Sequence, residues 1–419
     1  EVEDLEKLRT HLRSHAEFAP ATAAVLTALD AEGKAVDTST GLLTTETVAP
    51  YVVQQLVDLE APLKAGALVA EEVQGGNLSY AFRVADSEGH AVFVKQAPDF
   101  IKCLGPEAKL ERERMQLEVA VYGEWATMLG PELASKYLPK IFKLDLQRMT
   151  FIMEFLGSYE LLQKSLFRGV IDVHVARSMG ELMGLMHGRT HIKTVSSDVS
   201  ARLKRAYANE KLRGIQLHHV YTKAFSESDR PETDTYRKDA DFMAALEELR
   251  SAYRGEQDDN LALCHGDLHP GSVMADEAEG HVKIIDPEFA IYGPPGVDLG
   301  SLLSGYITAY VAHAARGCQR ADLIEAVREL WARYRATMLK AGVPAELVDR
   351  AGEDALGLGC CNVAQEMLGF AGVRVLPVQD PNLRRKAEDA ALALTYRCIK
   401  GRKGGGIELL LSELQSFSI

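Results

Sequence analysis

The sequence has no long hydrophobic run, no paired-cysteine motif and no excess of positive charge, and each absence excludes a class of protein. The most apolar stretch, residues 302–315, contains Ser, Gly, Thr and His and is too short to span a membrane. The six cysteines form no C-x-x-C pair, which argues against a zinc site or a disulfide framework and favours reduced, buried thiols. The net charge of −13 argues against a nucleic-acid partner, because a phosphate backbone attracts the opposite sign.

The composition is instead that of an ordinary globular chain. With 419 residues, of which 47% are hydrophobic and 26% charged, it is long enough for two lobes with cores of their own. No signal peptide is recognisable, so we expect a cytoplasmic protein. Because the sequence begins at Glu1 and not at Met, an organellar location after removal of a transit peptide stays open.

The most informative stretch runs from Leu261 to Gly300. Two short apolar segments in it each lead to carboxylates: the first to Asp267, the second to Asp286 and Glu288. Apolar segments bounded by Gly, Pro and Asp predict buried strands whose last residues reach a cleft. Three carboxylates in one cleft are costly unless a cation neutralises them, and their oxygens suit Mg²⁺. The pattern fits phosphoryl transfer, in which one carboxylate accepts the acceptor's proton and the others hold metal on the nucleotide.

A glycine-bearing hairpin and a lysine form a second pattern. Gly75, Gly76 and Asn77 lie at the predicted hairpin tip, where backbone N–H groups can approach phosphate oxygens. Lys95 ends the next apolar strand and is placed to reach the α- and β-phosphates of ATP. Glycine pairs are also common in hairpins without a ligand, and Lys95 could instead lie on an edge strand.

An acidic side chain in the predicted helix 110–125 is the expected partner of Lys95. Glu118 falls within the apolar stripe of this helix, where an acid requires a nearby cation. Three other glutamates of the same helix are alternatives: Glu111, Glu113 and Glu124.

Longer motifs in the central stretch resemble a known family. Residues 265–269 read HGDLH and are followed by Gly-Ser-Val at 271–273, by DPEFA at 286–290 and by Tyr-Gly-Pro at 292–294. This arrangement resembles the catalytic core of the kinase-like small-molecule phosphotransferases, the group of aminoglycoside phosphotransferases and choline kinases, and within it most closely the methylthioribose kinases. A small departure is Pro270, where the family usually has Thr.

The resemblance, over about residues 44–400, implies an α+β, two-lobed protein-kinase-like fold. The N-lobe would be a small antiparallel sheet and the C-lobe larger and mainly helical. The implied parts are an N-terminal helical extension at 1–43, the N-lobe for nucleotide phosphates at 44–153, the C-lobe for catalysis and substrate at 154–400, and a C-terminal tail at 401–419. The extension could be a docking or dimerisation arm, giving a homodimer or an assembly, or a helix pair that covers the small lobe.

The resemblance also implies roles for single residues. Ser272, where most members have Asn, would join Asp286 and Glu288 in holding Mg²⁺. Asn77 and Glu118 would belong to the nucleotide site with the glycines and Lys95. A stretch that matches the family's connection between lobes would pair with adenine through its backbone, with Phe replacing the family's Asp; it is Glu154, Phe155 and Leu156.

The implied function is ATP-dependent phosphorylation of a small sugar, most simply at the 1-hydroxyl of 5-methylthioribose, with Asp267 orienting and deprotonating that hydroxyl. Choline, homoserine and aminoglycosides stay open as acceptors. The family has two arginines after Gly-Phe-Ala-Gly, whereas this chain has only Arg374 nearby, which we expect to bind the substrate. This departure, together with Tyr-Thr-Lys-Ala at 221–224, leaves a catalytically silent scaffold or binding subunit as the alternative.

Three expectations concern the C-lobe outside these motifs. The polar stretch 226–241 predicts a mobile loop. His187 and His191 are spaced four residues apart without a third ligand, which predicts positions at a helix end and on the surface. Asp298 is expected to cap a helix or to brace the catalytic loop from behind.

Overall fold

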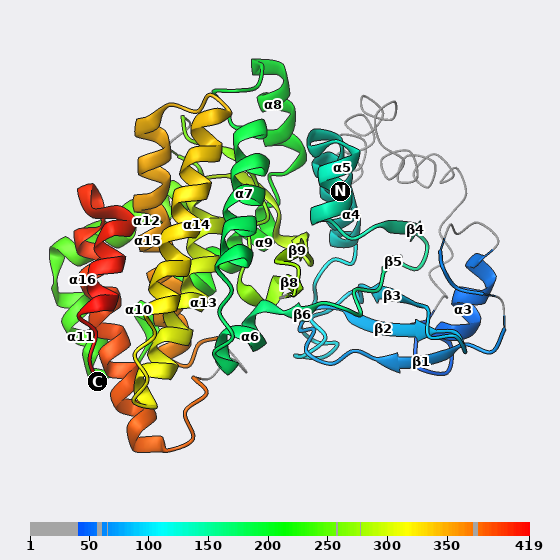
Figure 1. Cartoon of the computed structure of the whole chain (residues 1–419), viewed down its shortest axis with the longest axis horizontal. Helices are drawn as coiled ribbons and strands as arrows, with labels where there is room; N and C mark the ends of the chain where they lie inside the picture. Colours follow the sequence, from blue (N-terminus) through cyan, green and yellow to red (C-terminus); the bar gives the residue numbers. More distant parts are fainter. Residues whose placement is uncertain (1–40, 57–60, 65, 257–258, 277, 372–375) are drawn as a thin grey trace. The chain divides into compact units, whose positions relative to one another are not determined.

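The computed structural model describes residues 41–419 except 57–60, 65, 257–258, 277 and 372–375 (Figure 1). The chain divides into two compact units, one ending at Gly157 and the other running from Ser158 to Ile419. The first contains an antiparallel sheet and the second is mainly helical, which confirms the predicted α+β class. Every helix in the described ranges is too short or too polar to cross a membrane. The predicted N-terminal extension lies outside these ranges, apart from its last three residues.

The first unit is built on a five-stranded antiparallel sheet with the strand order β1-β2-β3-β5-β4. Its strands are β1 (Val69–Glu72), β2 (Tyr80–Ala85), β3 (Ala91–Gln96), β4 (Ile141–Asp145) and β5 (Thr150–Glu154). Its helices are α3 (Val48–Gln55), α4 (Arg114–Leu129) and α5 (Pro131–Tyr137).

Strand β3 is central in this sheet, since it pairs with β2 on one side and β5 on the other. Side chains alternate between the faces of a strand. Val92 and Val94 therefore share one face, where both are fully buried in a core with Val52 of α3. Lys95 belongs to the other face of the same strand. Its position in the middle of the sheet excludes the edge-strand alternative.

The second unit consists mostly of helices. They are α6 (Leu162–Arg168), α7 (Val173–Thr190), α8 (Ser197–Ala206), α9 (Glu210–His218), the π-helix η2 (His219–Lys223), α10 (Ala224–Glu227), α11 (Pro231–Lys238), α12 (Ala240–Arg254), α13 (Gly296–Ala315), α14 (Ala321–Lys340), α15 (Ala345–Met367) and α16 (Pro381–Gln415). Helix α7 packs along α14, and α15 contacts both α13 and α16 (Figure 1).

Small residues allow α7 and α14 to approach closely. An added Cβ at Gly184 would lie 2.6 Å from Thr337 Cβ, and one at Gly188 would lie 2.6 Å from Ala341 Cβ. Because the two glycines are four residues apart, they lie on one face of α7. This contact fixes α7 as part of the framework behind the strands of the unit.

The strands of the second unit form two small sheets. One has the order β6-β8-β9 and the other pairs β10 with β7. Their bounds are β6 (Glu160–Leu161), β7 (Ala262–Cys264), β8 (Val273–Asp276), β9 (His281–Ile284) and β10 (Ile291–Gly293), with the 3₁₀ turns η3 (Pro270–Ser272) and η4 (Pro287–Phe289) between them.

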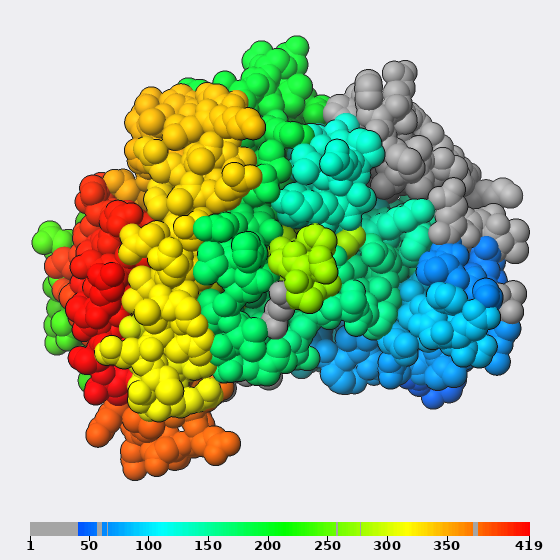
Figure 2. All heavy atoms as spheres, in the orientation of Figure 1, coloured from blue at the N-terminus to red at the C-terminus, as the bar shows by residue number. Residues whose placement is uncertain are grey.

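Helix α16 contains the predicted C-terminal tail up to Gln415. Its helical geometry is interrupted at Lys403, Gly404 and Gly406, and both glycines have positive φ, of 73° and 47°. Beyond the interruption Ile407 and Leu410 are buried again. Figure 2 shows the red surface of α16 beside the yellow surface of α14, so the end of the chain is packed into the helical unit.

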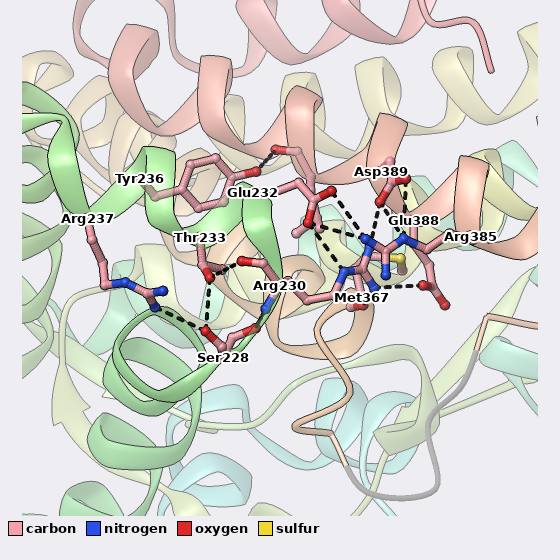
Figure 3. Close-up of polar contacts among 11 residues, drawn as sticks. Ser228, Arg230, Glu232, Thr233, Tyr236, Arg237, Met367, Arg385, Glu388 and Asp389 are labelled. Atoms are coloured by element: carbon pink, nitrogen blue, oxygen red, sulfur yellow. Dashed lines mark hydrogen bonds and ion pairs between the residues drawn. The ribbon is translucent and has the colours of Figure 1, made fainter.

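The prediction of a mobile loop at 226–241 is wrong, because helices α10 and α11 occupy most of it. Its polar residues are used in contacts with α16 (Figure 3). The guanidinium of Arg230 lies 3.0 Å from a carboxylate oxygen of Glu388 and 2.6 Å from one of Asp389. The hydroxyl of Tyr236 donates to the carbonyl of Leu392 at 3.0 Å. The polar composition of this segment is that of a loop, but its charges are neutralised by a helix distant in sequence, so the segment can be helical.

Candidate active site

In the first unit, Lys95 is paired with Glu118. Nζ of Lys95 lies 2.8 Å from Oε1 and 2.9 Å from Oε2 of Glu118, which α4 supplies. Both side chains are almost fully buried, at 6% and 1% exposure. Removing either partner would leave an uncompensated buried charge, which typically costs about 3–5 kcal/mol. The ion pair holds the lysine ammonium at a defined place on the sheet, whereas its role toward phosphates stays a prediction.

The glycine hairpin joins β1 to β2 and is exposed. Gly75 has φ of +106°, a conformation that favours glycine, and an added Cβ at Gly76 would lie 3.1 Å from the carbonyl oxygen of Ser79. The carbonyl of Asn77 accepts a hydrogen bond from the N–H of Cys103 at 3.0 Å, which anchors the tip. The turn is thus anchored and open to solvent, and phosphate binding by it remains a prediction.

The stretch predicted to bind adenine lies at the end of β5. The backbone N–H of Glu154 donates to the carbonyl of Lys140 at 2.8 Å, and its carboxylate accepts from the Lys140 N–H at 3.1 Å. The ring of Phe155 lies 5.2 Å from the guanidinium carbon of Arg83, and Leu156 is buried. Since the N–H of Glu154 is used between strands, adenine would have to pair with other backbone groups of this stretch.

In the second unit, Asp267 lies in the loop after β7. The preceding His265 places its Nε2 2.8 Å from the carbonyl oxygen of Ile285, which ties the loop to the end of β9. Gly266 has φ of +85°, and a Cβ added there would collide with the carbonyl of Phe289. Both the left-handed turn and the close approach require glycine at this position. The loop conformation therefore follows from the residues directly before Asp267.

Asp298 holds this loop from behind. Of the two roles expected from the sequence, capping a helix or bracing the loop, the structure shows the second. Its Oδ2 accepts from the backbone N–H of His265 at 2.7 Å and its Oδ1 from that of Gly266 at 2.8 Å. The side chain is fully buried. Burial raises the pKa of Asp298, but the hydrogen bond and charge of His187 and the N–H of His265 outweigh burial and bring the pKa below its ordinary value. The carboxylate is therefore ionised and acts as a charged brace.

The surface positions predicted for His187 and His191 are wrong, because both side chains are fully buried. Nε2 of His187 lies 3.0 Å from Oδ2 of Asp298, and its Nδ1 lies 3.1 Å from the hydroxyl of Tyr334. Nε2 of His191 lies 2.8 Å from Oδ1 of Asn260, and burial lowers the pKa of this histidine. His187 lies on the inward face of α7 against Tyr334 of α14, whereas His191 caps the C-terminal end of α7 and is buried beside Asn260.

The predicted metal ligands lie on one hairpin. Val273 of β8 pairs with Ile284 of β9, so the preceding Ser272 and the following Ile285 are neighbours, joined by an N–H···O bond of 2.9 Å. Asp286, with φ of +62°, follows directly, and Glu288 lies buried in η4. This turn is tied to the Asp267 loop through the bond from His265 to Ile285. The structure thus ties together the segments that carry the predicted base and the three candidate ligands.

The donor set fits Mg²⁺. Carboxylates and a hydroxyl are hard oxygen donors, and a magnesium site in a kinase usually combines one or two carboxylates with substrate phosphates. The side-chain amide of Asn209 donates at 3.0 Å to the carbonyls of Glu288 and Ala290, and so fixes the turn that carries the carboxylates. Sequence reasoning missed Asn209, because a single Asn before a helix has no distinguishing pattern.

Pro270, the departure within the catalytic motif, packs against α13. A Cβ added at Gly305 would collide with the ring of Pro270, so the loop and the helix touch without any side chain between them. Gly305, 35 positions later in the sequence, therefore leaves the space that the ring of Pro270 occupies.

Arg374, the predicted substrate ligand, lies outside the described residues. Close to it in sequence, the ring of Phe370 lies 5.9 Å from Nζ of Lys223. Lys223 ends the π-helix η2, which is the segment where the sequence departs from the family pattern. Single π turns in helices occur frequently at functional sites.

The comparison with protein families decides the broad assignment. The model of the phosphotransferase enzyme family matches residues 69–337, more than half of the chain. The chain belongs to this family. The match spans the site residues described above apart from Phe370 and Arg374, which lie after the matched residues.

Curated relatives of this phosphotransferase include methylthioribose kinases. The enzyme from Bacillus velezensis is 26% identical over 356 residues, which cover 80% of this chain and 87% of the relative. The enzyme from Yersinia pseudotuberculosis is 26% identical over 362 residues, which cover 78% and 85%. The predicted resemblance and the predicted reaction class, a kinase acting on a hydroxyl group of a small molecule, are confirmed.

A solved structure supports the fold. Choline kinase from Cryptosporidium parvum superposes with a TM-score of 0.53 at 14% identity, covering 89% of this chain and all of that one. At this identity the likeness concerns the fold alone. It confirms the predicted kinase-like architecture.

Proposed function

We propose that this phosphotransferase transfers the γ-phosphoryl group of ATP to the 1-hydroxyl of 5-methylthioribose. The observation that carries the proposal is the joining of the Asp267 loop to the Asp286 turn through the hydrogen bond from His265 to Ile285. The substrate is inferred from the curated relatives, which are methylthioribose kinases.

Each residue has a distinct task in this reaction. Asp267 accepts the proton of the sugar hydroxyl as its oxygen bonds to the γ-phosphorus and ADP leaves. Asp286 and Glu288, with Ser272, would hold Mg²⁺, which when bound neutralises charge on the phosphates. Lys95, held by Glu118, would bind the α- and β-phosphates.

Three further assignments belong to the same proposal. The backbone of Gly75, Gly76 and Asn77 would cover the phosphates, and that of Glu154 to Leu156 would pair with adenine. Arg374 would bind the sugar and the transferring phosphoryl group. The proposal also includes a cytoplasmic location, which cell fractionation tests. It further includes self-association through residues 1–43, which sedimentation of the chain with and without these residues tests.

A coupled ADP-release assay with methylthioribose as acceptor tests the activity, with choline, homoserine and an aminoglycoside as comparison acceptors. Asp267→Asn keeps the shape but not the basic carboxylate, so we expect kcat at least roughly a hundredfold lower, with the thermal shift by Mg·ATP retained. If only one of the comparison acceptors is turned over, that acceptor replaces methylthioribose as the proposed substrate. Mg·ATP binding without turnover of any acceptor would favour the silent scaffold or binding subunit.

A further inference from the structure

The carboxylate of Asp267 has a polar neighbour on each of its two oxygens. Nε2 of Gln216 lies 3.5 Å from Oδ1, and Nε2 of His269 lies 3.7 Å from Oδ2. The carboxylate is 24% exposed, and His269 is 18% exposed. Gln216 comes from α9, about fifty positions before the catalytic motif, and nothing in the sequence pattern distinguishes it.

The orientation of the Gln216 amide is fixed by Tyr253. The hydroxyl of Tyr253 donates to Oε1 of Gln216 at 2.6 Å. Burial raises the pKa of Tyr253, so its hydroxyl stays protonated and able to donate. A carboxylate only accepts hydrogen bonds, which requires the amide nitrogen to face Asp267. Both ends of the Gln216 amide are therefore matched to their neighbours.

The orientation of the His269 ring is fixed by Gly271. The backbone N–H of Gly271 donates to Nδ1 of His269 at 2.9 Å, so in the neutral ring the proton lies on Nε2, which faces Asp267. An added Cβ at Gly271 would lie 2.5 Å from Cε1 of this ring. Glycine at 271 thus leaves room for the ring in this position.

We propose that Gln216 and His269 are positioning residues that hold the catalytic carboxylate of Asp267 between the amide of one and the imidazole of the other. The Gln216 contact is a long hydrogen bond and the His269 ring lies just beyond hydrogen-bond distance, so both neighbours limit where the carboxylate can turn without pairing with it tightly. An arginine or lysine at either place would pair with the carboxylate and weaken it as a proton acceptor. The inference rests on the proposed function, because it gives Asp267 the role of the base.

Kinetics of matched variants test the inference. Gln216→Leu removes the donor at similar volume, and Tyr253→Phe removes only the hydroxyl that orients it. We expect kcat to fall roughly tenfold to a hundredfold in the first and less in the second, with KM for ATP unchanged, because a base displaced by about 1 Å costs up to roughly a hundredfold. Tyr236→Phe, which loses one buried hydroxyl bond on α11, should keep parent kcat.

Rescue separates positioning by His269 from a purely structural role. The amide nitrogen of His269→Gln can occupy the place of Nε2, whereas His269→Leu fills the space without a donor. We expect His269→Gln to recover most of the kcat lost in His269→Leu. Equal loss in both variants, at unchanged melting temperature, would overturn the role of His269.

Crystal structures of the parent and of Gln216→Leu give a test that needs no acceptor. We expect the Asp267 carboxylate to keep one rotamer in the parent and to change rotamer or become disordered in the variant. An unchanged Asp267 rotamer in Gln216→Leu would overturn the inference, whatever the activity. Absence of methylthioribose turnover in the parent would instead count against the proposed function alone.

Discussion

Asp298→Asn is the most informative single change, because the residue joins the loop that carries Asp267 to the helical framework. In the parent, the carboxylate accepts backbone bonds from His265 and Gly266 and contacts His187, with no exposed surface. The asparagine side chain has one oxygen, so its amide group must face one of the two backbone N–H donors. The substitution therefore turns a hydrogen bond into a donor–donor contact.

The expected cost follows from these contacts. A hydrogen bond to a charged group contributes about 1.5–3 kcal/mol, and removing one partner from a buried ionic group costs about 3–5 kcal/mol. We expect Asp298→Asn to lower the free energy of unfolding by about 3–5 kcal/mol. We also expect it to lower kcat roughly a hundredfold, because the loop would be displaced. The control Asp349→Asn breaks an exposed pair with Arg335, 2.8 Å apart, and should cost less than about 1 kcal/mol.

Urea unfolding checks the magnitude. The chain has two tryptophans, Trp125 in the first unit and Trp331 in α14 of the second. In a Trp125→Phe background, fluorescence therefore reports unfolding of the second unit alone. Because the pKa of Asp298 is lowered on folding, its contribution is present above pH ~4 and lost as the pH falls through its lower folded pKa, so the difference between parent and variant should shrink there. A cost below about 1 kcal/mol at pH 7 would refute the brace.

Three further predictions test other parts of the chain. Lys95→Ala should abolish the thermal shift by Mg·ATP and destabilise the first unit through the buried Glu118; an unchanged shift in a thermal melt would remove Lys95 from the phosphate site. Gly266→Ala, with positive φ and a clash with the carbonyl of Phe289, should lower the melting temperature and kcat together, and parent-like values for both would contradict the turn geometry. Burial raises the pKa of Asp354 to about 6, so folding favours its neutral form and stability falls as the pH rises from about 4 through 6; Asp354→Asn should therefore be more stable than the parent at pH 8 and gain less at pH 5, as calorimetry can measure.

The local motifs were predictable because their residues act close together in sequence. Asp267, Asp286 and Ser272 lie beside the ends of short apolar strands. Hairpin pairing of β8 with β9 brings Ser272 and Asp286 together, and the bond from His265 to Ile285 ties the Asp267 loop to them. Lys95 and Glu118 were predictable as a pair because each would be an uncompensated charge in an apolar element. In these cases the pattern of apolar and charged residues along one element was enough to predict the contact.

Long-range contacts could not be predicted in this way. The ring of His187 is buried by Tyr334, 147 positions later, and Arg230 is neutralised by carboxylates of α16 about 160 positions later. Gln216 reaches Asp267 from another helix. Composition within a window gives the polarity of a segment, but whether a polar side chain meets water or a distant partner depends on helix packing.

The contact between Pro270 and Gly305 has an evolutionary consequence. With proline at 270, a side chain of any size at 305 collides with the ring, whereas glycine at 305 places no such limit on residue 270. A lineage that moved from threonine to proline at 270 would therefore have needed glycine at 305 beforehand. Reversal is ordered too, since position 305 can regain a side chain only after the proline is lost. The clash therefore predicts that the two positions are an epistatic pair whose substitutions are accessible in one order.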